Sequence, residues 1–250
     1  MTSTILELKE LDVHYGPIQA LKKVSMHIEE GETVSLIGSN GAGKSTLLMS
    51  IFGQPRASGG QILYQGVDIT QKSSHYIASN GIAQSPEGRR VFPDMTVEEN
   101  LLMGTIPIGD QHAKEDMQRM FDLFPRLKER RNQRAMTMSG GEQQMLAIAR
   151  ALMSRPKLLL LDEPLGALDA LTRIEMQQLI ERLWRQHGFT VLLVTHDVSE
   201  AVAIADRVIL IEDGAVGLDL TLELPRPRVR GSHRLAALET EVLNRVLALP

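Results

Sequence analysis

Cysteine is absent from the 250 residues of this chain. Its absence excludes a disulfide framework, thiol catalysis and a zinc site built on cysteine ligands. The sequence also lacks any apolar run near the roughly 18 residues that a membrane-spanning helix needs. The first ten residues have neither the basic start nor the apolar core of a secretory signal. We therefore expect the chain to stay in the cytoplasm and to serve a membrane only through a partner.

An excess of positive charge is missing as well. The chain has 27 Lys and Arg residues against 31 Asp and Glu, which gives a net charge of -4. This balance offers no electrostatic footprint for nucleic acid, so we do not expect nucleic acid as a partner. The hydrophobic share of 43% is ordinary for a globular protein, and the length suits one or two domains with a sizeable core.

The most informative stretch is a glycine-rich loop between a short apolar run and a helix-forming run. Residues 33–37 are the apolar run, residues 38–46 fit the pattern G-x-x-x-x-G-K-[ST], and residues 47–53 continue as a helix. This is the strand-loop-helix context that the phosphate-loop pattern requires. A plain glycine-rich turn is the alternative, and we disfavour it because strand, spacing and helix all agree.

The chemistry of such a loop is local. Its glycines let successive N–H groups point at a phosphate, and the following helix adds the positive end of its dipole. Lys44 supplies a cation for the outer phosphates, and Ser45 offers a hydroxyl to Mg²⁺. The expected nucleotide-binding residues of the loop are Gly38, Ser39, Asn40, Gly41, Ala42, Gly43, Lys44, Ser45 and Thr46.

Strand and helix patterns alternate along the rest of the chain. Residues 5–37 predict strands, residues 86–155 are mostly helical, and buried strands are predicted at 157–161 and 190–194 with helices around them. We expect a parallel α/β core from residues 1–87 and 156–222, an inserted helical subdomain at 88–155, and a C-terminal tail and helix at 223–250. The basic segment 225–234 predicts a solvated linker.

Two acids follow the apolar strand at 157–161. Asp162 and Glu163 would lie at the carboxyl edge of the sheet, where ligands bind in open α/β folds. Asp162 can hold Mg²⁺, and Glu163 can polarise a water against a terminal phosphate. Alone, such a pair is more often two solvated acids, but the phosphate loop upstream favours the functional interpretation. His196 follows the next buried strand at the same edge, although a lone histidine is usually structural.

Ser139, Gly140 and Gly141 begin another helix and form a second potential anion site. One nucleotide does not need two such sites far apart in one chain. They make sense together if the second site serves a nucleotide that another subunit holds.

This set of segments resembles the ATP-binding subunits of ABC transporters, over essentially the whole chain. The resemblance implies a P-loop NTPase (RecA-like) α/β core with an antiparallel β subdomain and an inserted α-helical subdomain. It implies ATP and Mg²⁺ as ligands and Lys44, Glu163 and His196 as catalytic residues. It also implies Tyr15 for adenine stacking, worth about 1–3 kcal/mol, and Leu168-Asp169 as a turn linking two active sites.

The same resemblance implies the partners. Two chains, or this chain and a homologous ATPase subunit, would enclose the nucleotides as a dimer. Membrane permease subunits would hold that dimer peripherally on the inner face of the cell membrane, where hydrolysis would power import of a small solute. A soluble ABC protein without a permease is an alternative, but those relatives usually carry two cassettes or a long insertion, and only one phosphate loop occurs here.

The sequence departs from the family pattern twice. Glu87 stands where a glutamine usually senses Mg²⁺ and the permease, so the expected metal-site residues are Ser45, Glu87 and Asp162. Gln84, three residues earlier, could be mistaken for that position. Glu142 stands where the segment at 139–143 usually has glutamine, and a carboxylate there still suits a helix N-terminus.

The resemblance also divides along the chain. Residues 1 to about 160, especially 86–101, are similar to the ATPases of branched-chain amino acid importers. Residues from about 165 are similar to those of aliphatic sulfonate and taurine importers. This division predicts a chimera joined near residues 157–165, with either solute possible, and it leaves open a hybrid that binds ATP without coupling to transport.

Overall fold

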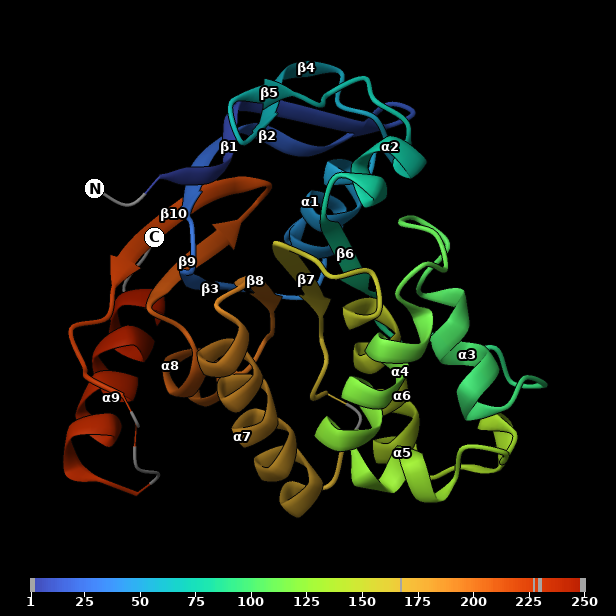
Figure 1. Cartoon of the computed structure of the whole chain (residues 1–250). Coiled ribbons are helices and arrows are strands. Elements are labelled where there is room, and N and C mark those ends of the chain that lie inside the picture. Colours follow the sequence, from blue (N-terminus) through green and yellow to red (C-terminus); the bar gives the residue numbers. More distant parts are fainter. Residues whose placement is uncertain (1–2, 167, 227, 229–230, 248–250) are drawn as a thin grey trace.

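The computed structural model describes residues 3–166, 168–226, 228 and 231–247. Within these residues, the chain forms a six-stranded and a four-stranded sheet with helices packed around them (Figure 1). The strands of the larger sheet, in spatial order, are β10 (Ala215–Thr221), β9 (Arg207–Glu212), β3 (Thr33–Ile37), β8 (Thr190–Val194), β7 (Leu158–Asp162) and β6 (Ile82–Ser85). The expectation of an α/β fold is confirmed.

The larger sheet is parallel from β9 to β6, and β10 is antiparallel to β9. Every residue of β3, β7 and β8 is buried. Both faces of the sheet are covered, and these strands are therefore continuous apolar runs rather than alternating ones. Their carboxyl ends meet at one edge, so the loops after β3, β7 and β8 are neighbours in space.

The smaller sheet is antiparallel and covers one side of the core. Its order is β2 (Ile18–Glu29), β1 (Thr4–Tyr15), β4 (Gly59–Tyr64) and β5 (Val67–Asp68). Its apolar residues pack with α1 (Lys44–Ile51) and with Leu158 and Leu160 of β7 in one buried cluster. The antiparallel β layer expected from the family resemblance is therefore present.

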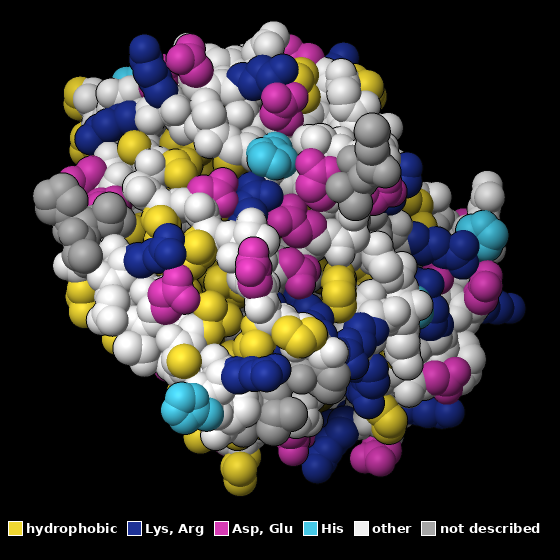
Figure 2. Space-filling view, turned by 90° about the vertical axis from the view of Figure 1, so that its left-hand side faces the viewer, with side chains coloured by type: hydrophobic (Ala, Val, Ile, Leu, Met, Phe, Trp, Pro, Cys, Tyr) yellow, Lys and Arg dark blue, Asp and Glu magenta, His cyan; other side chains and the backbone are white. Residues whose placement is uncertain are grey.

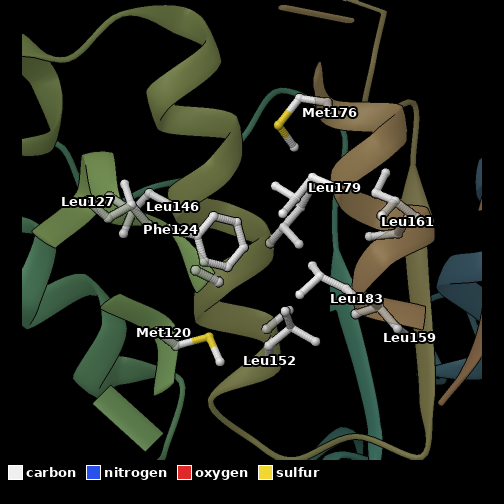
Figure 3. Packing of buried hydrophobic residues seen from close by; sticks show 14 of the residues in the cluster. Met120, Phe124, Leu127, Leu146, Leu152, Leu159, Leu161, Met176, Leu179 and Leu183 are labelled. Atoms are coloured by element: carbon white, nitrogen blue, oxygen red, sulfur yellow. The ribbon is translucent and has the colours of Figure 1, made fainter. Parts of the chain in front are cut away.

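The opposite face of the sheet carries a helical layer. The helices between β6 and β7 are α3 (Val97–Met103), α4 (Ala113–Leu123), α5 (Pro125–Glu129), a 3₁₀ turn (Ala135–Thr137) and α6 (Gly140–Leu152). In Figure 3 the side chains of α4 to α6 pack against α7 (Ala170–His187) and β7. Met120, Phe121 and Phe124, which follow helical spacing, are buried here. The boundaries expected for this layer, residues 88–155, stay a prediction.

The remaining helices lie at the two ends of the core. They are α2 (Ser74–Ser79), α8 (Val198–Ile204) and α9 (His233–Leu247). The helix α9 packs on α8 through Leu235 and Val242. None of the helices in the described part of the chain is long and apolar enough to cross a bilayer. The face seen in Figure 2, which is the side of the N-terminus and α9, carries acidic and basic side chains intermixed.

Two arginines of the basic segment after β10, Arg226 and Arg228, contact the core rather than extending into solvent. The side chain of Arg226 is only 10% exposed and forms an ion pair with Asp206 at 2.8 Å. Arg226 also donates to the carbonyl of Ile204, and Arg228 donates to the carbonyls of Val202 and Ala205. These carbonyls end α8 and have no partner within the helix, so the two arginines satisfy them. Residues 227, 229 and 230 lie outside the described part.

Candidate functional site

The phosphate loop connects β3 to α1 and closes around its own lysine. Lys44 is buried, and its Nζ donates to the carbonyl oxygens of Gly38 and Ser39 at 2.8 and 3.0 Å. Gly38 needs to be glycine, because a Cβ there would lie 2.2 Å from the carbonyl oxygen of Ile211 in β9. Residues 38–46 thus form a tight backbone cradle with a cation at its centre, as phosphate binding requires.

A buried carboxylate lies beside this cradle. Asp162 ends β7 and accepts a hydrogen bond from the Ser45 hydroxyl at 3.0 Å. Burial raises the pKa of Asp162 above its usual value, and the nearby carboxylates of Glu87 and Glu163 add to that rise. A buried carboxylate with the negative charges of half-buried Glu163 and exposed Glu87 nearby favours a cation at this place.

The donor atoms at this place fit Mg²⁺. A hydroxyl and a carboxylate offer the hard oxygen ligands that this ion prefers, and it usually takes its remaining ligands from substrate phosphates and water. Among the described residues, no three His, Cys, Asp or Glu side chains are arranged to hold a metal ion by themselves. The site is therefore of the kind that binds the metal together with a nucleotide rather than alone.

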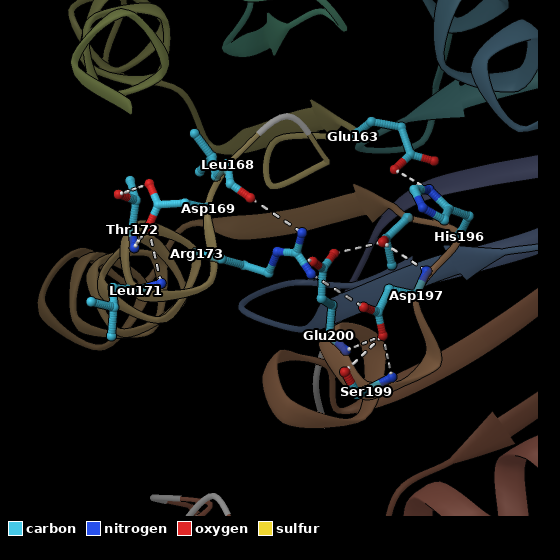
Figure 4. Close-up of polar contacts among 11 residues, drawn as sticks. Glu163, Leu168, Asp169, Leu171, Thr172, Arg173, His196, Asp197, Ser199 and Glu200 are labelled. Atoms are coloured by element: carbon cyan, nitrogen blue, oxygen red, sulfur yellow. Dashed lines mark hydrogen bonds and ion pairs between the residues drawn. The ribbon is translucent and has the colours of Figure 1, made fainter. Parts of the chain in front are cut away.

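Glu163 and His196 form the second pair of the site (Figure 4). His196 Nδ1 lies 2.9 Å from Glu163 Oε2, and because a carboxylate only accepts, this ring nitrogen carries the proton. Glu163 has a left-handed backbone with φ of 45°, which costs a residue other than glycine about 1–2 kcal/mol. Its backbone N–H donates to the carbonyl of Val194 at 3.0 Å and holds it in this conformation.

A cavity of about 570 Å³ joins these groups. The structure thus brings most of the residues expected from the phosphate loop together with Glu87, Glu163 and His196. Sequence analysis did not single out Gly88 or Gly166, which also border the cavity; each adjoins an expected segment. The residues lining the cavity are Asn40, Gly41, Gly43, Lys44, Ser45, Thr46, Glu87, Gly88, Glu163, Gly166 and His196.

Three of the expected loop residues and Tyr15 do not line this cavity. Gly38 and Ser39 contribute through the Lys44 ammonium, and Ala42 is buried beneath the loop. Tyr15 ends β1 and is 46% exposed, so its ring is accessible to a ligand from solvent.

The segment at Ser139, Gly140 and Gly141 lies apart from the cavity. The Ser139 hydroxyl accepts from the Glu142 N–H, and Glu142 accepts from the Ser139 N–H at 2.9 Å, which makes a capping box at the start of α6. Arg130 donates to Glu142 at 2.6 Å. The glutamate that departs from the family pattern is therefore used to fix this helix terminus.

The two glycines of this segment permit close approaches. A Cβ on Gly140 would lie 2.7 Å from Nη2 of Arg89, and one on Gly141 would lie 2.6 Å from Cγ2 of Thr172. The side chains of Arg89 and Thr172 therefore pack directly against the N-terminal end of α6. Ser139, Gly140 and Gly141 are not among the residues that line the cavity.

Comparisons with known proteins agree with this geometry. The family model described as ABC transporter matches residues 21–166. The chain is 53% identical over 245 residues to the aliphatic sulfonates import ATP-binding protein SsuB of Pseudomonas fluorescens, covering 98% of this chain and 87% of that protein. It is 51% identical over 250 residues to the SsuB of Pseudomonas putida, covering 100% of this chain and 88% of that protein.

Solved structures are similar as well. The dimeric post-hydrolysis state of the ATP-binding cassette MJ0796, bound to ADP and Pi, superposes with a TM-score of 0.77 at 28% identity, covering 88% of this chain and 100% of that one. The ADP conformation of the cassette MJ1267 superposes with a TM-score of 0.81 over 99% of this chain at 24% identity, which supports the fold. The chain therefore belongs to the ABC transporter family, as one of its ATP-binding and ATP-hydrolysing subunits.

Proposed function

We propose that two copies of this chain enclose two ATP molecules with Mg²⁺, and that hydrolysis powers import of an aliphatic sulfonate through a membrane permease. The observation that carries the nucleotide chemistry is the shared cavity, in which Lys44 and Ser45 face Glu163 and His196. The observation that carries the solute is the identity of 51–53% to aliphatic sulfonate import proteins across nearly the whole chain.

The residues of the cavity divide the chemistry between them. The loop N–H groups and Lys44 bind the phosphates, and the lysine exchanges its backbone carbonyls for phosphate oxygens. Glu163 takes a hydrogen bond from the attacking water, whose oxygen bonds to the terminal phosphorus as the bond to ADP breaks. The proton leaves toward Glu163. His196 fixes this carboxylate through its Nδ1–H, so the base keeps its direction.

Ser45, Asp162 and Glu87 would hold the metal. When bound, Mg²⁺ neutralises charge on the phosphate oxygens during phosphoryl transfer. Asp162 and Glu163 keep separate tasks because one is hydrogen-bonded to the phosphate-loop helix and the other to His196. Glu87 brings a charge where relatives of this family usually have an amide, so we expect its contact with the metal to be stronger.

The second half of each nucleotide site comes from the partner chain. Ser139, Gly140 and Gly141 present a capped helix terminus that the phosphate loop of the same chain does not use. In a two-fold dimer, each such terminus can face the other chain's nucleotide, and one interface completes both sites. Tyr15 would stack on the adenine from the exposed end of β1. The dimeric structure of the cassette MJ0796 supports this arrangement.

A groove beside the nucleotide cavity suits a permease segment. It has a volume of about 380 Å³, and its rim carries Phe92 and Ile106, which are 40% and 59% exposed. Gln84 of β6 lines this groove, and Glu87, three residues later, lines the nucleotide cavity. A permease helix seated here would sense the nucleotide through residues 84–87. The permease would place the chain on the inner face of the cell membrane.

The alignment with sulfonate import proteins runs through the proposed junction at residues 157–165 without interruption in its coverage. It gives no support to a chimera or to a branched-chain amino acid as solute. We therefore assign one solute class, aliphatic sulfonates, to the whole chain.

The test is hydrolysis and transport with one variant and two permeases. Glu163→Gln should keep MgATP binding but lose hydrolysis by roughly 100-fold or more, because it removes the base and keeps the shape. In proteoliposomes with the permease of a sulfonate importer, the wild-type chain should drive sulfonate uptake and the variant should not. Uptake only with a branched-chain amino acid permease would refute the solute, and full turnover by the variant would refute the role of Glu163.

A further inference from the structure

Arg173 lies where three parts of the site converge. It belongs to the first turn of α7 and extends toward α8 (Figure 4). Its Nη2 donates to the carbonyl of Leu168 at 3.3 Å, its Nε lies 3.4 Å from a carboxylate oxygen of Glu200, and its Nη1 lies 3.8 Å from Asp197. The guanidinium thus joins the turn before α7 to two acids of α8 or its cap.

The two acids in turn fix both neighbours of His196. Glu200, whose side chain is 4% exposed, accepts a hydrogen bond from the Thr195 hydroxyl at 2.7 Å. Asp197 caps α8 by accepting from the N–H groups of Ser199 and Glu200. The N–H of Asp197 donates to the Thr195 hydroxyl oxygen at 3.1 Å. His196 therefore lies between Thr195 and Asp197, which are hydrogen-bonded to each other. Thr195 contacts Arg173 through Glu200, and Asp197 lies beside Arg173 directly.

The Leu168 contact anchors the other member of the catalytic pair. Glu163 begins the segment that ends at Leu168. In the described part of this segment, the N–H of Gly166 donates to the carbonyl of Glu163 and the N–H of Leu168 donates to the carbonyl of Leu165. Arg173 holds the far end of the same segment. One cation is thus attached to the backbone that carries Glu163 and to the acids that fix His196.

We propose that Arg173 is the positioning residue that keeps Glu163 and His196 in register for hydrolysis. The inference rests on the proposed function and adds a residue that touches neither the nucleotide cavity nor the metal-site residues. Lysine cannot replace it fully, because an ammonium is a point charge and cannot reach a carbonyl and two carboxylates together. Burial raises the pKa of Glu200, and the hydrogen bond from Thr195 and the charge of Arg173 both act against that rise.

The test compares Arg173→Gln, Arg173→Lys and the control Arg207→Gln. Arg207 likewise pairs with two acids, Glu32 and Asp219, but it is more buried than Arg173 and lies at the opposite end of β3 from the phosphate loop. Arg173→Gln should lower kcat by roughly 10- to 100-fold, since a misplacement of about 1 Å can cost 100-fold. The Kd for MgATP should change less than about twofold because the phosphate loop is untouched. Arg173→Lys should recover part of kcat.

The control variant should lose thermal stability but keep the kcat of its folded fraction. The Hε1 NMR signal of His196, identified by its loss in His196→Ala, should shift in both Arg173 variants and not in Arg207→Gln. A kcat equal to wild type in both Arg173 variants, or an unmoved His196 signal, would overturn the positioning role.

These outcomes separate the inference from the proposed function. A wild-type chain that hydrolyses no MgATP would refute the function, and the His196 signal would still test the positioning. A wild-type chain that hydrolyses MgATP while both Arg173 variants match it would refute the inference alone.

Discussion

The Ser45 hydroxyl donates to the Asp162 carboxylate across 3.0 Å, although 117 residues separate the two in the sequence. This contact joins the first turn of the helix after the phosphate loop to the end of β7. Because β3 and β7 are not adjacent in the sheet, β8 lies between them and sets the distance. The metal site is therefore built by the sheet order rather than by one loop.

Ser45→Ala should destabilise the chain by about 1.5–3 kcal/mol at pH 7, because it removes a hydrogen bond to a charged, buried group. Burial already holds the folded-state pKa of Asp162 above its usual 3.8, and the Ser45 hydrogen bond lowers it. Without that bond the pKa rises further. The loss of stability should therefore shrink as pH falls and Asp162 becomes protonated.

Urea unfolding of Ser45→Ala at pH 7 and pH 5 measures this dependence. Ser50→Ala is the matched control, because the Ser50 hydroxyl in the same helix donates to the neutral carbonyl of Leu47 at 2.8 Å. Its cost should not vary with pH. A Ser45→Ala cost that is equally large at both pH values would contradict the role of the charge.

Gly38→Ala should destabilise the chain more than Gly41→Ala. A methyl group on Gly38 would lie 2.2 Å from the Ile211 carbonyl oxygen, and β9 cannot retreat because it is paired with β3. Overpacking of this kind costs about 1–3 kcal/mol. Gly41 also has a positive φ, of 85°, but nothing lies within 4 Å of its Cβ position, so only a backbone strain of about 1–2 kcal/mol remains.

Thermal unfolding without nucleotide measures both changes. The melting temperature should fall further for Gly38→Ala than for Gly41→Ala. The reverse order would show that backbone conformation, rather than the approach of β9, restricts the residue at position 38.

Glu142→Gln should lower stability at pH 7 but not at low pH. Burial alone would raise the pKa of Glu142, yet hydrogen bonds from Ser139 and the ion pair with Arg130 outweigh it and hold the pKa below the usual 4.5. Because the folded-state pKa lies below the unfolded one, the carboxylate stabilises the fold above about pH 4.5 and loses that effect as pH falls through the folded-state value.

Denaturant unfolding between pH 3 and pH 7 tests this expectation. Glu99→Gln is the control, since Glu99 forms the equivalent capping box with Thr96 and its pKa is lowered mainly by hydrogen bonds from Thr96. Its effect should have the same sign and be smaller, because its pKa is lowered mainly by Thr96 whereas Glu142 also has an ion pair with Arg130. A Glu142→Gln difference that grows toward low pH would contradict the capping role.

Arg226→Ala should destabilise the attachment of the C-terminal segment. The guanidinium lies 4.3 Å from the ring centre of Trp184, and such contacts contribute about 0.5–2 kcal/mol. Each kcal/mol should lower Tm by about 2–4 °C in a chain of this size. Calorimetry checks the shift, and Arg226→Lys should recover only part of it. A Tm equal to wild type in Arg226→Ala would mean that the segment is not held by this residue.

Sequence patterns predicted the parts of the site that depend on local spacing. The phosphate loop and the apolar strand ending in Asp162 both follow from neighbours in the chain. The order of the strands in the sheet cannot be derived from residue spacing alone. The family resemblance was therefore needed to predict that these segments form one site. The division into two importer families found no support, since short similar segments do not outweigh identity across the whole chain.

Contacts between distant segments were beyond prediction. A run with Pro225, Arg226 and Arg228 has the composition of a linker, and it is docked through contacts with the carbonyls that end α8, with Asp206 and with Trp184. Arg173 belongs to no short pattern, because its partners lie at Leu168, Asp197 and Glu200. In both cases the carbonyls and carboxylates that contact the arginine belong to other segments, so they can be identified only from the three-dimensional structure.

The position of β3 has a consequence for synthesis on the ribosome. Both of its neighbours, β8 and β9, come from residues 190–212, and β9 supplies the carbonyl against which Gly38 rests. A nascent chain that has emerged only through residue 180 would have translated every residue of the glycine cradle and would still lack both strands that flank it. The native cradle can therefore bind a nucleotide only after β8 and β9 have been synthesised and have paired with β3.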